Sequence, residues 1–532
     1  MKGGQTTYAA LILIMLLGLG LAYVLYSGPY YSFDDMNYIT YAHQVLVGTF
    51  SPVQSPYAYG FMIPFTMAVS FAIFGVNTFA VAFPSIVRYI IIILATFLVA
   101  RKLYKDEVAI ISAFLVATAP FIVGYVTRAL PDISTGAAAS LSILFFLYAQ
   151  NSKHRKLFYF LSGVAAAVTV YFKMIGLAYI LFFIVAILIY KPEAKRKDAQ
   201  RTNPLQHEGV AYPLAGLALM SVIYVTILFA YGGSITGPFV AYGQNQASIS
   251  PSTFYKNILT LAIVLFGYSS SNALIGPVVD PQIFPLGFTL FWALAGTVIS
   301  LYRREKNIIF LSVIFWGVFL YLFFGTVSIT SYSFITVISR YFALVALPLC
   351  VIAGYALWDL YKVFAIVFKQ RAKLMLGLLL ALTLLSDLPI YLALYNYNML
   401  IAGDARTISA VLSSVTSAAH GGNVYLYSND NYAVSYLDFL MDYHGPVNAS
   451  LLQFRSKGLL TSQLNGICTP NAVNTYILID YNNYSKLQTE TIVNNWLVPA
   501  CNMTKVGSFN DSMAQSAIYN SYNLNIDLYK VR

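Results

Sequence analysis

The run YAALILIMLLGLGLAYVLY at residues 8–26 decides the fold, because it carries no charged residue along its whole length. Roughly 20 apolar residues in a helix cross the hydrocarbon core of a bilayer, so this run predicts a membrane span. Ten further runs are also predominantly apolar: 83–100, 107–125, 133–150, 157–172, 175–190, 211–231, 285–302, 308–325, 340–361 and 373–393. We therefore predict an all-α polytopic membrane domain with about eleven transmembrane helices.

The composition of the 532-residue chain agrees with this class. Hydrophobic residues make up 59%, charged residues only 10%, and the mean hydropathy is +0.69, which lies outside the range of soluble domains. The first span follows Lys2 without a small-residue cleavage site, which favours an uncleaved signal anchor.

The net charge of +11 is explained by short basic loops, and it needs no nucleic acid partner. Clusters of Lys and Arg mark cytoplasmic loops in membrane proteins. They occur here at 101–105, 153–156, 191–201, 303–306 and 362–373. The resulting topology predicts a multi-pass protein of the cell membrane with a cytoplasmic N-terminus and an extracellular C-terminal domain. Two apolar runs, 61–75 and 258–270, would each place basic loops on the outer side if they crossed the membrane. We therefore expect both to be interfacial or re-entrant.

The chain divides by composition into a membrane domain, 1–396, and a hydrophilic tail, 397–532. Alternating apolar residues at 423–427 and 475–480 predict strands, and the stretches 404–418 and 484–497 predict helices. We therefore expect an extracytoplasmic α/β domain.

The cysteines and glycosylation sequons agree with an outer tail. Cys350 falls within a span, whereas Cys468 and Cys501 both lie in the tail and could form a disulfide in an oxidising compartment. Every Asn-x-Ser/Thr sequon also lies there, and these give four candidate glycosylation sites: Asn448, Asn483, Asn502 and Asn510.

The long first outer loop, 27–83, contains two adjacent carboxylates in the motif FDDMNY, Asp34 and Asp35. The apolar residues that follow have the spacing of an amphipathic helix lying on the membrane, which Gly48 would end. Asp35 is placed to cap that helix, a structural role that leaves Asp34 unexplained. His43 belongs to the polar face of the same helix rather than to a catalytic site.

Four cations lie outside the basic cytoplasmic loops, and the predicted topology places them near one plane at the outer surface. They are Arg88, Arg128, Lys173 and Arg340. A buried cation is unfavourable without an anionic partner, and the local acids are too few, so the surplus predicts a phosphate. At this surface the natural ligand is a lipid phosphate. Two structural explanations stay open: Arg88 and Arg340 could reach the headgroups, and Arg128 could simply pair with Asp132.

The order and common sidedness of four motifs resemble the GT-C superfamily of membrane glycosyltransferases. These are FDDMNY at 33–38, TRALPD at 127–132, YFKMIGL at 171–177 and SRYFALVALP at 339–348. The most similar branch comprises protein O-mannosyltransferases and aminoarabinose transferases, which use polyprenyl-phosphate sugars. The chain lacks the Trp-Trp-Asp-Tyr-Gly motif of oligosaccharyltransferases.

The resemblance implies roles for individual residues. Asp34 and Asp35 would be catalytic with Asp132 as their partner, and Lys173 and Arg340 would hold the phosphate of a polyprenyl or dolichyl donor. A carboxylate base and fixed cations are what an inverting displacement of a lipid phosphate requires. The acceptor could be a glycan, a lipid or a protein.

Metal use and two other function classes stay open at this point. Asp34, Asp35 and Asp132 could supply oxygen ligands to a divalent Mg or Mn ion. A transporter or flippase of a lipid-linked anion would share the cations, but it would place polar or broken helices at the bilayer midplane. A scaffold whose tail binds a partner is the third hypothesis.

Overall fold

The computed structural model describes residues 2–26, 33–190, 208–244, 286–326 and 339–418, and in the tail 424–428, 447–451, 463, 467–468, 475–480, 501, 503–510 and 525–531. The chain is mostly helical and forms two compact units. The first unit comprises Met1–Tyr26, Val47–Met67 and Ala82–Leu394. The second comprises Ser27–Leu46, Ala68–Val81 and Tyr395–Arg532.

Each of the eleven predicted spans contains a helix. These helices are α1 (Lys2–Val24), α4 (Thr78–Leu103), α5 (Asp106–Ala117), α7 (Pro131–Ala149), α8 (Arg155–Phe172), α9 (Gly176–Tyr190), α10 (Glu208–Ala230), α13 (Gly287–Arg303), α14 (Lys306–Phe324), α15 (Ala346–Phe368) and α16 (Ala372–Ala418). Within the described residues, six helical stretches are both long and apolar enough to cross a membrane. The number of crossings stays a prediction.

Shorter helical segments connect the long helices. They are η1 (Pro56–Tyr59), α3 (Met62–Phe74), α6 (Pro120–Val123), α11 (Gly237–Gln244), η4 (Ser339–Val345) and η5 (Lys369–Arg371). With 13 residues, α3 spans only about 20 Å, so it is too short to cross the bilayer, as expected for 61–75. The other predicted interfacial segment, 258–270, lies outside the described residues.

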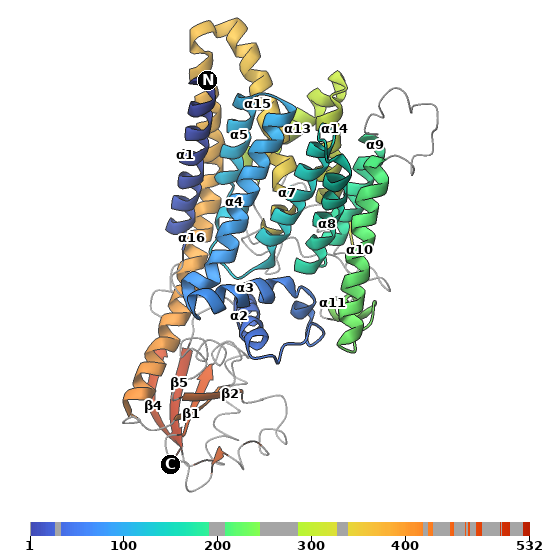
Figure 1. The fold of residues 1–532 in the computed structure, drawn as a ribbon. Helices are drawn as coiled ribbons and strands as arrows, with labels where there is room; N and C mark the ends of the chain where they lie inside the picture. Colours follow the sequence, from blue (N-terminus) through green and yellow to red (C-terminus); the bar gives the residue numbers. More distant parts are fainter. Residues whose placement is uncertain are drawn as a thin grey trace. The chain divides into compact units, whose positions relative to one another are not determined.

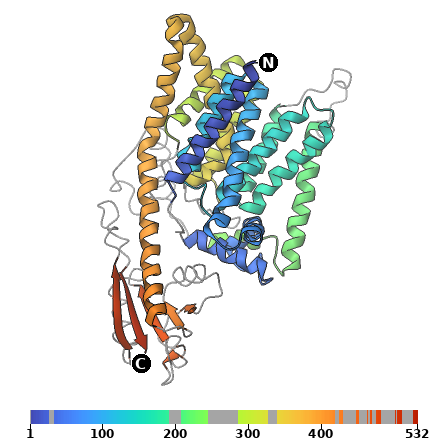
Figure 2. The same ribbon diagram turned by 60° about the vertical axis from the view of Figure 1, so that its left-hand side comes forward.

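In the first unit, α8 packs against both α7 and α10, and α10 lies at one edge of the bundle (Figures 1 and 2). Two glycines allow the close approach of α8 and α10. A Cβ atom on Gly163 would lie 1.9 Å from the carbonyl oxygen of Pro213, and one on Gly216 would lie 2.3 Å from that of Phe160. Close backbone contact through small residues is the usual way in which membrane helices associate.

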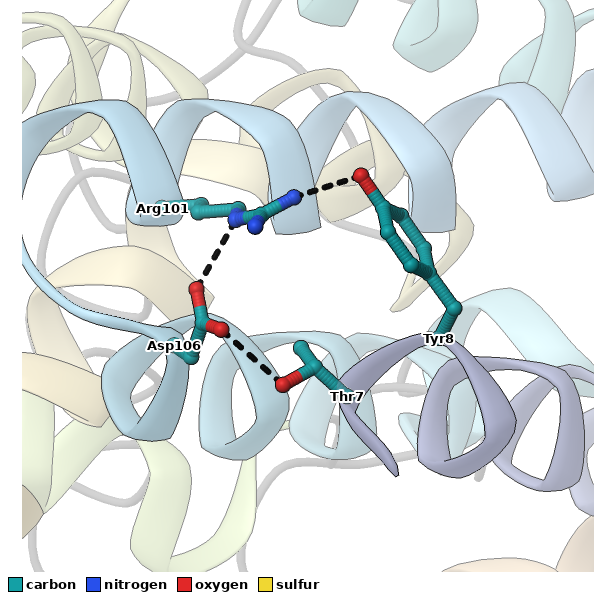
Figure 3. A network of polar contacts seen from close by, with 4 residues as sticks. All are labelled: Thr7, Tyr8, Arg101 and Asp106. Carbon is teal, nitrogen blue, oxygen red and sulfur yellow. Dashed lines mark hydrogen bonds and ion pairs between the residues drawn. The ribbon is translucent and has the colours of Figure 1, made fainter. Parts of the chain in front are cut away.

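A polar network joins α1 to the adjoining ends of α4 and α5 (Figure 3). Arg101 Nε lies 2.8 Å from Asp106 Oδ1, and a guanidinium nitrogen of Arg101 donates to the Tyr8 hydroxyl at 2.6 Å. The Thr7 hydroxyl donates to Asp106 Oδ2 at 2.9 Å. The network thus attaches the first helix at the basic end of the bundle.

The predicted span 107–125 is not one continuous helix. α5 ends at Ala117, Ala119 adopts an extended conformation, and α6 starts at Pro120. Proline lacks an N–H group and disfavours the helical conformation of the residue before it, so Pro120 forces the interruption.

In the second unit, α2 (Phe33–Leu46) confirms the predicted helix after the acid pair. Its apolar face is buried at Met36 and Ile39, and Gly48 follows its end with a φ of +76°. The prediction that Asp35 caps this helix is wrong, because α2 begins at Phe33 and both acids lie within its first turn. Carboxylates in a first turn still interact favourably with the helix dipole.

The tail contains a five-stranded sheet with the order β2-β1-β3-β5-β4. Its strands are β1 (Val424–Ser428), β2 (Val447–Leu451), β3 (Thr475–Asp480), β4 (Met503–Asn510) and β5 (Asn525–Val531). β1 pairs in parallel with β2 and β3, whereas β5 pairs antiparallel with β3 and β4. Both predicted strands are confirmed, and the predicted helix 404–418 forms the end of α16.

The predicted Cys468–Cys501 disulfide is present, with the two Cα atoms 5.2 Å apart, and Cys350 is a buried free thiol. Asn448 lies in β2 and Asn510 ends β4, whereas Asn483, Asn502 and the predicted helix 484–497 lie outside the described residues. Glycosylation and the extracellular location of the tail stay predictions.

Candidate active site

Asp132 is a buried carboxylate in the first turn of α7. The extended conformation of Leu130 and the proline at position 131 start the helix, so the next side chain lies beside its free backbone N–H groups. The Asp132 side chain is only 2% exposed. A helix N-terminus stabilises negative charge, but a carboxylate this buried also needs cations.

Two of the predicted cations meet Asp132 from distant parts of the sequence. Lys173 Nζ donates to Asp132 Oδ1 at 2.7 Å, and Arg340 Nε lies 3.5 Å from Asp132 Oδ2. Both cationic side chains are 14% exposed. Asp132 therefore pairs with Lys173 and Arg340, and not with Arg128, the local pairing that the sequence left open.

The backbone explains how these residues reach one another. α8 ends at Phe172, and the extended conformation of Lys173 turns the chain sharply toward α9. Arg340 lies in η4, which packs against α7 at Gly136, where a Cβ atom would lie 2.3 Å from the carbonyl oxygen of Ala343. Only glycine permits this contact. It places η4 beside Gly136, which lies one helical turn after Asp132 along α7.

Tyr341 is a site residue that the sequence reasoning missed. Lys173 Nζ lies 3.9 Å from the centroid of its ring, a distance at which a cation is attracted to the ring face. Its position directly after Arg340 was the only available signal, and tyrosine is too common in this chain to make that signal specific.

Arg88 forms a second cationic position in the same unit. Its guanidinium donates to the Thr66 hydroxyl and lies 4.9 Å from the centroid of the Phe172 ring, and Phe172 directly precedes Lys173. No carboxylate pairs with Arg88 among the residues that the structure describes. Among the described residues, these two neighbouring positions hold one carboxylate and three cations, an arrangement that suits an anion.

Arg128 is also buried, in the segment that joins α6 to α7. Its backbone carbonyl accepts a hydrogen bond of 3.0 Å from the Ser85 hydroxyl on α4, which is buried as well. This bond fixes the TRALPD segment against the helix that carries Arg88.

Asp34 and Asp35 lie in the second unit, in the first turn of α2. Asp35 is completely buried, and Asp34 is partly exposed. The structure therefore brings Asp132, Lys173 and Arg340 together, while the roles of the acid pair stay predictions.

The residues present only partly fit a divalent metal ion. Among the described residues, no group of three or more His, Cys, Asp or Glu side chains could hold a metal. Both oxygens of Asp132 already face cations, so this carboxylate does not suit a further positive ion. The metal hypothesis consequently rests on Asp34 and Asp35.

Comparison with known proteins gives one family match. Residues 56–220, which include Arg88, Arg128, Asp132 and Lys173, match the family described as dolichyl-phosphate-mannose-protein mannosyltransferase. No curated protein sequence matches the chain.

Several solved structures share the fold. ArnT from Cupriavidus metallidurans in the apo state has a TM-score of 0.61 at 13% identity, covering 99% of this chain and 98% of that chain. The same protein bound to undecaprenyl phosphate has a TM-score of 0.58 at 13% identity, covering 97% of both chains. The oligosaccharyltransferase of Archaeoglobus fulgidus in the apo form has a TM-score of 0.50 at 13% identity, covering 91% of this chain and 71% of that chain.

Proposed function

We propose that the chain is a membrane glycosyltransferase of the GT-C superfamily, in the branch of mannosyltransferases and aminoarabinose transferases, and that it uses a polyprenyl-phosphate sugar. The sugar moves to an acceptor hydroxyl at the outer face of the cell membrane. The acceptor is a glycan, a lipid or a protein.

The observation that carries this proposal is the group of largely enclosed cations around Asp132 and at Arg88. Lys173 and Arg340 both contact the carboxylate of Asp132, and among the described residues Arg88 contacts a hydroxyl group and an aromatic ring but no carboxylate. A phosphate would supply the missing negative charge and would accept several charge-assisted hydrogen bonds. Undecaprenyl phosphate and dolichol phosphate, bound to two proteins of the same fold, are ligands of this chemistry.

The proposed reaction is an inverting displacement at the anomeric carbon. The acceptor oxygen forms a bond to this carbon while the bond from the carbon to the phosphate oxygen breaks. Asp34 takes the proton of the acceptor hydroxyl, with Asp35 as the second candidate base. Lys173, Arg340, Arg128 and Arg88 stabilise the negative charge on the leaving lipid phosphate.

In this scheme, Asp132 is a positioning residue. Its two oxygens hold Lys173 and Arg340 at fixed places before the donor binds, so that the cations need not reorganise during the reaction.

The test is a transfer assay with membranes that contain the full chain. A radiolabelled polyprenyl-phosphate sugar is supplied, and the label is followed to a new acceptor. We expect transfer by the native protein and none by Asp34→Asn, with both proteins equally folded in detergent. A fully active Asp34→Asn protein would remove Asp34 as the base, and absence of any transfer with several sugars would refute the proposal.

A transporter or flippase for a lipid-linked anion is the second candidate. The interruption between α5 and α6 favours it, because broken helices often form binding sites in transporters. Movement of the intact labelled lipid across the bilayer without cleavage of the sugar bond would select this alternative.

A further inference from the structure

A segment of the loop between α2 and α3 packs against the turn that carries Lys173. The short helix η1 ends at Tyr59, and the next residue, Gly60, lies against the backbone of Phe172, which directly precedes Lys173. A Cβ atom on Gly60 would lie 2.3 Å from the Phe172 carbonyl oxygen and 3.1 Å from the carbonyl carbon. The φ of Gly60 is −85°, which other residues also adopt, so it is the contact that requires glycine here.

Three buried aromatic rings hold this contact from three segments of the chain. The Tyr171 ring, at the end of α8, meets Phe61 edge-on with the centroids 5.2 Å apart, and it meets Tyr224 of α10 edge-on at 5.1 Å. Phe61 stacks on Tyr224 at 5.6 Å. The Tyr171 hydroxyl also donates to the backbone carbonyl of Met220 in α10 at 2.5 Å. Aromatic pairs in these arrangements are favourable beyond the area that they bury, so the rings join the loop to α8 and α10.

The Tyr224 hydroxyl connects the two sides of the contact. It donates to the backbone carbonyl of Tyr59 at 3.2 Å and lies 3.5 Å from the sulfur atom of Met174. Met174 directly follows Lys173. Contacts from the loop and from α10 therefore hold the residues on both sides of this cation.

The place of this turn decides where two cations find their partners. Lys173 Nζ donates to Asp132 Oδ1 at 2.7 Å, and the Phe172 ring lies with its centroid 4.9 Å from the guanidinium of Arg88. A shift of the turn backbone would change both contacts at once.

We propose that Gly60 and Tyr224 are positioning residues that hold Lys173 in place for the phosphate of the donor, a role that rests on the proposed function. They act on the backbone beside Lys173 and not on the substrate. A cation that is already in place stabilises the leaving phosphate without having to reorganise during the reaction. Packing alone would affect only stability, so the test measures Lys173 itself.

Gly60→Ala should force the Phe172 backbone away, because the added methyl group meets main-chain atoms that no side-chain rotation can remove. The kcat/KM for the polyprenyl-phosphate sugar should fall by roughly 10-fold to 100-fold, since a displacement on the order of 1 Å can reduce the rate by such a factor. Tyr224→Phe removes only the hydroxyl and should give a smaller loss in the same direction. This milder variant carries the test should Gly60→Ala fail to fold.

A second readout follows Lys173 without any substrate. The full chain in detergent is treated with sulfo-N-hydroxysuccinimidyl acetate, and acetylation of Lys173 is measured by peptide mass spectrometry, with the exposed Lys306 as the internal reference. In the native protein the Lys173 side chain is 14% exposed and bonded to Asp132, so it should react slowly. Both variants should raise the rate, Gly60→Ala by roughly tenfold, the factor expected when a hydrogen bond to a charged group is lost.

Gly296→Ala is the matched control, because a Cβ atom there would lie 2.5 Å from the carbonyl oxygen of Ile352 and would collide with the backbone between α13 and α15. It should lower the melting temperature without changing the acetylation of Lys173 or kcat/KM. Unchanged acetylation or unchanged kcat/KM in both Gly60→Ala and Tyr224→Phe, or the same changes in the control, would overturn the proposal. Absence of transfer by the native protein would instead refute the proposed function, and acetylation would still show whether these residues hold Lys173.

Discussion

At the residue scale, the central feature is a single buried carboxylate between two cations. The sequence predicted that Asp132, Lys173 and Arg340 belong to one site, because topology placed all three at the same membrane face. It could not predict which cation pairs with which acid, since ion pairs depend on side-chain geometry across distant segments. The contacts of Tyr341 and Thr66 escaped prediction for the same reason.

Replacing Asp132 by Asn should destabilise the protein by about 3 kcal/mol, because two largely buried cations would lose their carboxylate. Thermal unfolding in detergent would measure the loss. Asp106→Asn is the matched control, since its ion pair with Arg101 is about one-third exposed and should contribute less than about 1 kcal/mol. Equal shifts in the two variants would contradict the assigned role of Asp132.

Replacing Arg88 by Gln should raise the KM for the polyprenyl-phosphate donor by roughly 10-fold to 100-fold, the range expected for a lost hydrogen bond to a charged group. Thr66→Val removes the hydroxyl that accepts from Arg88 but keeps the cation, so its effect should be smaller. The readout is steady-state kinetics with varied donor concentration. An unchanged KM in Arg88→Gln would exclude Arg88 from phosphate binding.

At the element scale, the hydrophobic pattern predicted the helices but not their interruptions or caps. The run 107–125 is predominantly apolar, and its hydropathy does not indicate that Pro120 divides it into two helices. Asp35 has the residue type and position of an N-cap, yet α2 starts two residues earlier. Helix ends depend on single backbone hydrogen bonds, which periodicity does not specify.

The start of α13 against α16 offers a test of packing between these two helices. Gly287 has a φ of +45°, and a Cβ atom there would lie 2.1 Å from Asp387 Oδ1. The backbone N–H of Phe288 donates to the Ser386 hydroxyl at 3.1 Å, and the Trp292 indole donates to Thr383 at 3.0 Å. Gly287→Ala should therefore lower stability by about 1–3 kcal/mol.

The matched control is Gly377→Ala in α16, where no atom lies within 4 Å of the added Cβ. Alanine in an open helix position should raise stability by about 0.5–1 kcal/mol. Melting curves of both variants in the same detergent would compare the two effects. A neutral result for Gly287→Ala would mean that the two helices can separate at this point without loss.

At the scale of the whole molecule, composition predicted a helical membrane part and a mixed tail, and the five-stranded sheet agrees with this division. The strand order was not predictable, because the parallel pairing of β1 with β2 and β3 joins segments that are far apart in the sequence. Residues 27–46 and 68–81 group with the tail residues in one compact unit, which follows from spatial contacts that no local pattern records.

The disulfide of the tail provides a prediction at this scale. Reduction of the intact protein should increase its mass by two hydrogens, and limited proteolysis should then cleave the tail faster. A bridge between residues 33 apart typically contributes about 2–4 kcal/mol. Cys350→Ser is the control, since this thiol is buried in α15 and unpaired. Identical masses with and without reductant would remove the bridge.

The Cys468–Cys501 disulfide also bears on the stage of synthesis at which the tail becomes covalently crosslinked. Such bonds form and persist mainly where thiols meet an oxidant, which for most cells means beyond the cytosol. With the tail outside the cytosol, as the charge pattern predicts, a nascent chain would acquire this crosslink only after translocation. Cell-free expression in a reducing lysate should yield protein whose helices are inserted but whose tail lacks the disulfide. A later oxidation step would then be needed to form it.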